Sequence, residues 1–184
     1  MRPQERDRDL SNCPRILGID PGSLSCGYGI IGTDGDRCDY IASGRIVLDA
    51  KSPLDVRLKE IYEGLREIIR QHRPYEAVVE KIFFAKGAKS ALSLGHARGA
   101  ALLAAASEGL PVHEYSALEV KKAVTGYGRA EKRQVQEMVR RILNIKTALS
   151  SDGADALAIA LCRTNRKGLD DILRPPSKRK GRAV

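Results

Sequence analysis

Two acidic residues stand directly after short apolar runs, where a carboxylate is costly unless something compensates its charge. Asp20 follows the run 16–19, and Glu80 follows the run 77–79. An ionised carboxylate in a low-dielectric environment is unfavourable unless it is paired or bound to a cation. Either residue alone would be explained by capping a nearby turn or helix. On adjacent strands, both would emerge at the same edge of a sheet.

A second pair of acids, Asp152 and Asp155, is spaced by three residues. This spacing places both on one face of the first turn of a predicted helix. Acids in a first turn commonly complement the helix dipole, which accounts for one of the two. The small residues around them, such as Gly153 and Ala156, permit close packing. Two inward-facing acids in such a setting are more typical of the edge of an active site.

Four carboxylates from three separate segments match the ligand preference of hard divalent cations. Mg²⁺ prefers oxygen ligands and keeps several of its waters. Two such ions about 4 Å apart can activate a water molecule and stabilise the leaving oxygen in phosphodiester hydrolysis. The absence of a His and Cys cluster disfavours zinc. The residues alone therefore predict metal-dependent phosphoryl chemistry and leave the substrate open.

The elements that must position these acids can be predicted from hydrophobic patterning and turn residues. Strands are expected over 16–20, 27–32, 39–48, 77–80 and 111–115. The first three are separated by tight turns, at 21–22 and 34–36, which is typical of an antiparallel meander. The later strands alternate with helices. This order predicts an α/β fold, a five-stranded mixed sheet flanked by helices.

Capping residues mark where the helices begin. Ser52 is expected to cap the first helix, with Pro53 at its first position, and that helix ends before Pro74. Ser116 and Glu119 form a capping-box pattern ahead of a short helix. The remaining helices are expected over 90–107, around 135–143 and over 151–166.

Composition indicates one globular domain with a basic surface. The 184 residues include 32 Lys and Arg against 23 Asp and Glu, a formal net charge of +9, which favours a polyanionic partner. We expect a disordered, frayed extension over 1–14, one globular domain over 15–168 and a basic flexible tail over 169–184. The tail is as typical of a solvated segment as of a phosphate-binding arm.

Nothing in the sequence indicates secretion or a membrane. The four cysteines form no CxxC pair and are expected to be reduced thiols. There is no N-terminal apolar segment of signal-peptide type, and no apolar stretch approaches the roughly 18 residues of a membrane span. We therefore expect a cytoplasmic protein.

Several short sequence blocks together match one known family. They lie at 16–23, 27–29, 79–86, 90–92, 95–99, 130–132 and 152–158. With these blocks in order and spacing, the chain resembles the RuvC family of bacterial Holliday junction resolvases from about residue 15 to 166. Two departures are the N-terminal extension and Lys81, where other members can carry an uncharged polar residue. They leave any cleavage-sequence preference open.

The resemblance implies a ribonuclease-H-like fold and a homodimer that binds four-way junction DNA. It implies paired, symmetric nicking of two strands of like polarity during recombination and DNA repair. Two Mg²⁺ ions are expected per active site, with Mn²⁺ able to substitute. RuvA and RuvB, the branch-migration proteins, are implied partners. A two-fold dimer would present two identical sites to a nearly two-fold substrate.

The resemblance also assigns residues. The catalytic metal ligands would be Asp20, Glu80, Asp152 and Asp155. Phe83 would insert at the junction and stack on a base, a contact that tolerates any sequence because every base has a π-face. Lys121 and Lys132 would bind DNA near the scissile phosphate, and Lys132 would also take part in catalysis. The alternatives are a core role for Phe83 and solvated helix positions for the two lysines.

Three residues near the middle of the chain are expected to have a role other than catalysis. Ser93, His96 and Arg98 are expected to line the dimer or DNA face.

Three other functions are the alternatives. An ATP-binding protein of the actin, Hsp70 and sugar-kinase superfamily shares the first-strand pattern but needs two such domains, and the length provides one. A related nuclease acting on RNA or another DNA structure would keep the metals. A junction-binding protein without catalysis would have no use for four carboxylates.

Overall fold

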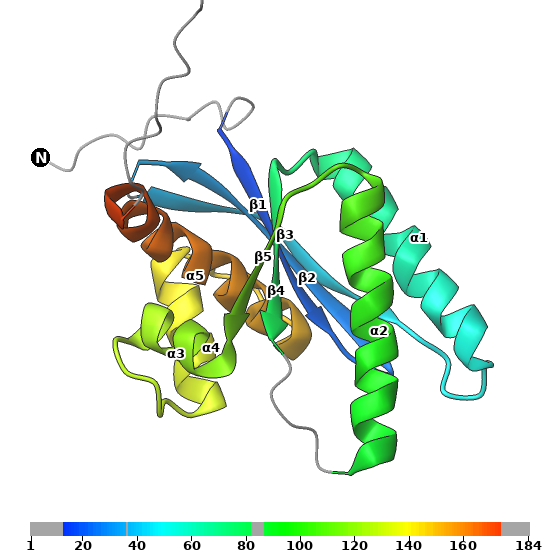
Figure 1. Cartoon of the computed structure of the whole chain (residues 1–184). Coiled ribbons are helices and arrows are strands. Elements are labelled where there is room, and N and C mark those ends of the chain that lie inside the picture. The colour runs from blue at the N-terminus through cyan, green and yellow to red at the C-terminus, as the bar shows by residue number, and fades with distance from the viewer. Residues whose placement is uncertain (1–12, 36, 82–86, 174–184) are drawn as a thin grey trace, which may run out of the picture.

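The fold is a five-stranded mixed sheet with helices on both faces (Figure 1). The computed structural model describes residues 13–35, 37–81 and 87–173. The strand order is β3-β2-β1-β4-β5. The bounds are Arg15–Pro21 for β1, Ser25–Asp34 for β2, Arg37–Val47 for β3, Glu76–Lys81 for β4 and Val112–Ser116 for β5.

The pairing directions follow the prediction. Strands β1, β2 and β3 form an antiparallel meander, and β4 pairs in parallel with both β1 and β5. Alternate residues of the central strands face opposite layers, as the two-residue period of a strand requires. Ile16 and Val78 pack in one core cluster, whereas Leu17 and Val79 pack in the other. The predicted five-stranded mixed α/β sheet is confirmed.

The helices divide between the two faces. Their bounds are Leu54–His72 for α1, Ala88–Ser107 for α2, Ala117–Thr125 for α3, Lys132–Ile142 for α4 and Ser151–Leu173 for α5. Residues of α1 and α2 pack with one core cluster, and residues of α3, α4 and α5 pack with the other, so the sheet lies between them (Figure 1).

Two helix ends differ from the prediction. Pro53, not Ser52, is the N-cap of α1, because the Pro53 carbonyl accepts the first helical hydrogen bond, from the Arg57 amide at 3.2 Å. Helix α5 continues to Leu173 instead of ending near residue 166. A glycine inside a helix, here Gly168, costs only about 1 kcal/mol, which good helix formers around it offset. The capping box of Ser116 and Glu119 is present.

Helix α5 rests directly on the backbone of the sheet. A Cβ atom at Gly18 would stand 1.9 Å from the Ala156 carbonyl oxygen, and one at Gly27 would stand 2.4 Å from the Asp152 carbonyl oxygen. Any other residue at these two positions would push α5 away. The glycines thus bring the start of α5 to the ends of β1 and β2.

The four cysteines, Cys13, Cys26, Cys38 and Cys162, are free thiols. Among the helices that the structure describes, none combines the length and apolar character needed to cross a membrane. The residues 1–12 and 174–184, which include most of the predicted extension and tail, lie outside the described part of the chain.

Candidate active site

The register of the sheet brings Asp20 and Glu80 to one edge. Ile19 pairs with Val79 in the parallel ladder between β1 and β4, and each acid is the next residue along its strand. On its other side, Asp20 pairs with Gly27 of β2. The expectation that both acids emerge at the same edge of the sheet is therefore confirmed.

Helix α5 carries the other two acids to this edge. Its first turn lies against β2, where the Ser25 hydroxyl donates to Asp152 Oδ2 at 2.8 Å. Asp155 lies one turn further along, and its Oδ2 is 2.6 Å from Lys132 Nζ at the start of α4. Asp155 interacts electrostatically with both Asp20 and Glu80. Acids from three distant segments thus meet at one edge.

Crowding of the carboxylates changes their acidity. Burial, followed by the charges of Asp155 and Glu80, raises the pKa of Asp20 from 3.8 to about 7, although Lys132 opposes the rise. Burial and the charge of Asp155 raise the pKa of Glu80, against the opposing charges of Lys121 and Lys132. Desolvation and like charges both disfavour the ionised form. The edge therefore carries more negative charge than its own lysines compensate.

The chemistry of this donor set fits a hard divalent cation. Carboxylate oxygens are the ligands that Mg²⁺ and Mn²⁺ prefer, and a cation would relieve the repulsion that raises the Asp20 pKa. Within residues 13–35, 37–81 and 87–173, however, no three Asp, Glu, His or Cys side chains are arranged to hold a metal ion together. Lys132 is instead the cation bound to Asp155. The carboxylates would have to turn toward one another to share an ion.

Two of the three predicted DNA contacts lie in the described part of the chain. Lys121 in α3 and Lys132 in α4 both act electrostatically on Glu80, so both lie at the acidic edge. Phe83 falls in the segment 82–86, outside the described residues. Arg98, which was expected to line the dimer or DNA face, contacts the sheet: its Nε donates to the Glu80 carbonyl oxygen at 3.3 Å.

Sequence reasoning missed Ser25 and this contact of Arg98. Arg98 also forms an ion pair with Glu114 of β5, which ties α2 to the strand beside Glu80. Serine in a turn is common and carries no signal of its own. The role of Ser25 depends on α5 crossing β2, a contact between residues 127 positions apart.

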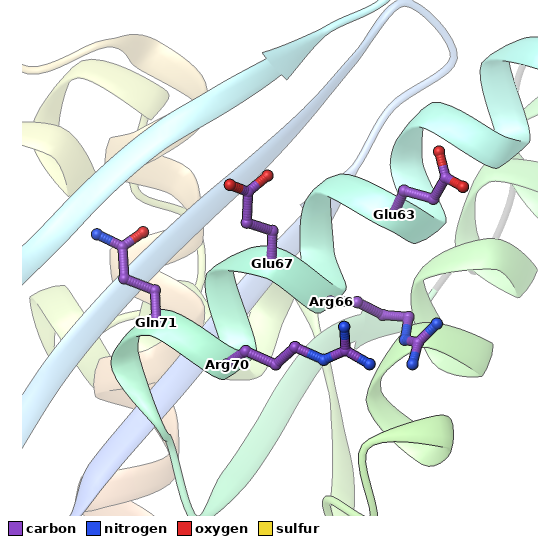
Figure 2. A pocket seen from close by; sticks show the side chains of 5 residues that line it. All are labelled: Glu63, Arg66, Glu67, Arg70 and Gln71. Carbon is purple, nitrogen blue, oxygen red and sulfur yellow. The ribbon is translucent and has the colours of Figure 1, made fainter.

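A hollow on α1 lies away from this edge. Its volume is about 680 Å³. Figure 2 shows the side chains that line it, which are Glu63, Arg66, Glu67, Arg70 and Gln71. Glu108 binds both arginines, with Oε1 at 2.6 Å from Arg66 Nε and 3.0 Å from Arg70 Nη2. Helix α1 covers the face opposite α5. The hollow therefore has no contact with the four acids.

Comparison with known proteins identifies the family. The family model described as Crossover junction endodeoxyribonuclease RuvC matches residues 16–163. RuvC of Geobacter sulfurreducens is 49% identical over 160 residues, covering 87% of this chain and 98% of that protein. RuvC of Saccharophagus degradans is 53% identical over 150 residues, covering 82% and 87%.

A solved structure extends the likeness to three dimensions. Thermus thermophilus RuvC in complex with a Holliday junction substrate is similar with a TM-score of 0.81 and 33% identity, covering 85% of this chain and 96% of that chain. The ribonuclease-H-like form of the sheet is thereby confirmed. The two-domain nucleotide-binding alternative is wrong. The chain belongs to the RuvC family of crossover junction endodeoxyribonucleases.

Proposed function

We propose that this protein resolves Holliday junctions in DNA recombination and repair, by paired symmetric nicks in two strands of like polarity. The observation that carries the proposal is the position of Asp20, half-buried at the sheet edge beside Glu80 and Asp155, with its pKa raised to about 7. A group of mutually repelling carboxylates has no structural benefit. It has a use when a divalent cation and a phosphate group are bound there.

The metal ligands in this proposal are Asp20, Glu80, Asp152 and Asp155. They would hold two Mg²⁺ ions, with Mn²⁺ as a substitute. Bound there, the ions would supply an activated water and stabilisation of the leaving oxygen. The protein's own contribution is to fix the carboxylates: the Ser25 hydroxyl orients Asp152, and strand pairing fixes Asp20.

The proposed DNA contacts surround the acidic edge. Lys132 is more than half exposed although its Nζ binds Asp155, so the ammonium can meet a phosphate oxygen at the same place. Its charge would stabilise negative charge that develops on the phosphate. Lys121 would add a second cation for the DNA backbone. Phe83 is proposed, from the family resemblance, to stack on a junction base.

We propose that the active form is a homodimer paired through α2. The outer face of this helix exposes Leu92 by 62% and Leu103 by 59%. Between them, Cβ atoms added at Gly95 and Gly99 would meet nothing within 4 Å. The glycines let a second helix approach closely, and the exposed leucines beside them give that helix an apolar surface to cover. A two-fold axis at this face would make the surface complementary to itself.

Family membership supports three further proposals. RuvA and RuvB are the proposed partners, and the cytoplasm is the proposed location. Residues 15–168 are proposed as the nuclease unit, although α5 runs past this boundary to Leu173. The N-terminal extension and the basic tail are proposed as appendages of that unit.

The experiment that tests the function compares substrates. Purified protein is incubated with a mobile four-way junction, linear duplex DNA and an RNA–DNA hybrid, with Mg²⁺ or with chelator. We expect paired symmetric nicks on the junction only, lost with chelator. Cutting of the duplex or the hybrid instead would favour a related nuclease with another substrate. Junction binding without any cutting would favour a non-catalytic binding protein.

A further inference from the structure

Glu76 is a buried carboxylate at the opposite end of β4 from Glu80. The residue is only 3% exposed. The Tyr75 hydroxyl donates to its Oε1 at 2.6 Å, His113 Nε2 lies 3.0 Å from Oε2, and Arg163 Nε donates to Oε2 at 3.2 Å. A charge buried away from the acidic edge takes no part in the proposed chemistry. It therefore needs a separate explanation.

The Glu76–Arg163 ion pair joins two of the three elements that carry the acids. Glu76 and Glu80 are both in β4, and Arg163 and Asp155 are both in α5. Arg163 also donates from Nη1 to the Tyr115 hydroxyl of β5, at 3.5 Å. Helix α5 thus runs back along the sheet, with Asp155 near the end of β4 and Arg163 near its beginning.

The spacing along the two elements agrees. Asp155 and Arg163 are separated by about 12 Å along the helix axis, at 1.5 Å per residue. Glu76 and Glu80 are separated by about 13 Å along the strand, at roughly 3.3 Å per residue. Because the two distances are nearly equal, an ion pair between Glu76 and Arg163 places Asp155 beside Glu80 at the other end of β4.

Between the Ser25–Asp152 hydrogen bond at one end and Arg163 at the other, the residues of α5 that pack on the sheet are mostly apolar. Gly18 lies under Ala156 and Ala160, and Leu157 fills the space above Gly29. Apolar contacts are not directional, so they oppose small movements of a helix along its axis only weakly. A buried ion pair contributes little net stability, but it fixes a geometry, and setting register is its best-attested use.

We propose that the Glu76–Arg163 pair sets the axial position of α5 on β4, so that Asp155 lies level with Glu80. Both are then positioning residues for the proposed metal ligands, about 12 Å from the site at which they act. The inference rests on the proposed metal site for its effect on catalysis. The position of α5 itself can be measured without any metal.

The test is the double variant Glu76→Gln/Arg163→Met. It removes both charges of the pair together, so neither Glu76 nor Arg163 is left buried as an unpaired charge. The glutamine oxygen still accepts from Tyr75, and methionine replaces the apolar stem of the arginine. We expect a folded protein whose crystal structure has α5 displaced by about 1 Å along its axis, a misplacement that can cost roughly 10²-fold in rate. Mn²⁺ affinity, measured by titration calorimetry, should fall by about tenfold or more.

The matched control is Arg66→Met, which breaks one of the two ion pairs between α1 and Glu108, on the opposite face of the sheet from α5. It should leave both α5 and Mn²⁺ affinity unchanged. If the double variant does not fold, Arg163→Lys, which keeps the buried charge but loses the guanidinium fork, is tested with the same two measurements. A folded variant with α5 in place and unchanged Mn²⁺ affinity would overturn the inference. If wild-type protein binds no Mn²⁺, the proposed metal site is wrong, and the position of α5 still decides the inference.

Discussion

Lys132 Nζ lies 2.6 Å from Asp155 Oδ2, so a lysine at the start of α4 binds an acid near the start of α5. This contact joins two helices at the edge where β1 and β4 end. It also gives the acidic edge a cation of its own. The same side chain lowers the pKa of Asp20 and Glu80, against the effects of burial.

Replacing Lys132 separates these roles. In Lys132→Met the opposing charge is lost, so the pKa of Asp20 in metal-free protein should rise above its value of about 7. Cleavage should fall roughly 10²-fold or more, as when one stabilising donor is removed. Carboxyl NMR titration in chelator and junction cleavage measure the two effects. Lys132→Arg, which keeps the charge, should preserve the pKa. An unchanged Asp20 pKa in Lys132→Met would contradict this account.

Ser25 provides a test of how the ligands are oriented. Ser25→Ala removes the hydroxyl that donates to Asp152 Oδ2. Loss of an outer hydrogen bond to a metal ligand commonly costs 10- to 100-fold in metal affinity, so we expect a decrease of about tenfold. Titration calorimetry with Mn²⁺ measures it. Ser25→Thr keeps the hydroxyl and serves as the control. Equal affinities of Ser25→Ala and wild type would show that Asp152 needs no such support.

The raised pKa of Asp20 predicts a dependence of stability on pH. Folding raises its pKa from 3.8 to about 7, so the folded state keeps the proton to a higher pH than the unfolded state does. The resulting stabilisation is complete below about pH 4 and is lost as the pH rises through about 7. An asparagine at position 20 cannot ionise. Measured in chelator at about pH 8, Asp20→Asn should therefore exceed wild type by up to about 4 kcal/mol in the free energy of unfolding.

Denaturant unfolding of Asp20→Asn and wild type at about pH 5 and about pH 8 checks this prediction. The gain should be clearly smaller at the lower pH, where much of the wild-type Asp20 is still protonated. A gain of the same size at both pH values would mean that ionisation of Asp20 is not its cause.

The proposed dimer can be tested on α2. Leu92→Glu/Leu103→Glu places four like charges together if two copies meet at this face, so the dimer should dissociate. Sedimentation measures the oligomeric state. On a cruciform plasmid, cutting should change from linear product to nicked circle, because the two cuts are no longer paired. Leu118→Glu alters a residue that is 60% exposed, but in α3, and should remain dimeric. A dimeric double variant would exclude this face.

Much of the fold follows from local sequence patterns. Apolar runs closed by glycine and proline predict the strands, and Asp20 and Glu80 could be predicted because each ends such a run. The Ser116 capping box could be predicted because both partners lie within one turn. The end of α5 could not be predicted in this way, because a single glycine costs too little to end a helix.

The contacts that the sequence does not reveal are the long-range ones. Ser25 with Asp152, Lys132 with Asp155 and Glu76 with Arg163 each depend on how α5 lies across the sheet. The four acids were expected to form one ligand set. The structure brings them to one edge and pairs Asp155 with Lys132, a contact between α4 and α5 that no local pattern predicts.

The most direct test of the central claim is cleavage by Asp20→Asn on a four-way junction with Mg²⁺. The control is Asp34→Asn, at the far end of β2 from the acidic edge. We predict that Asp20→Asn binds the junction as wild type does in a gel-shift assay, but loses cleavage by roughly 10³-fold or more, while Asp34→Asn cuts normally. If Asp20→Asn cuts the junction at the wild-type rate, the acidic edge is not the active site.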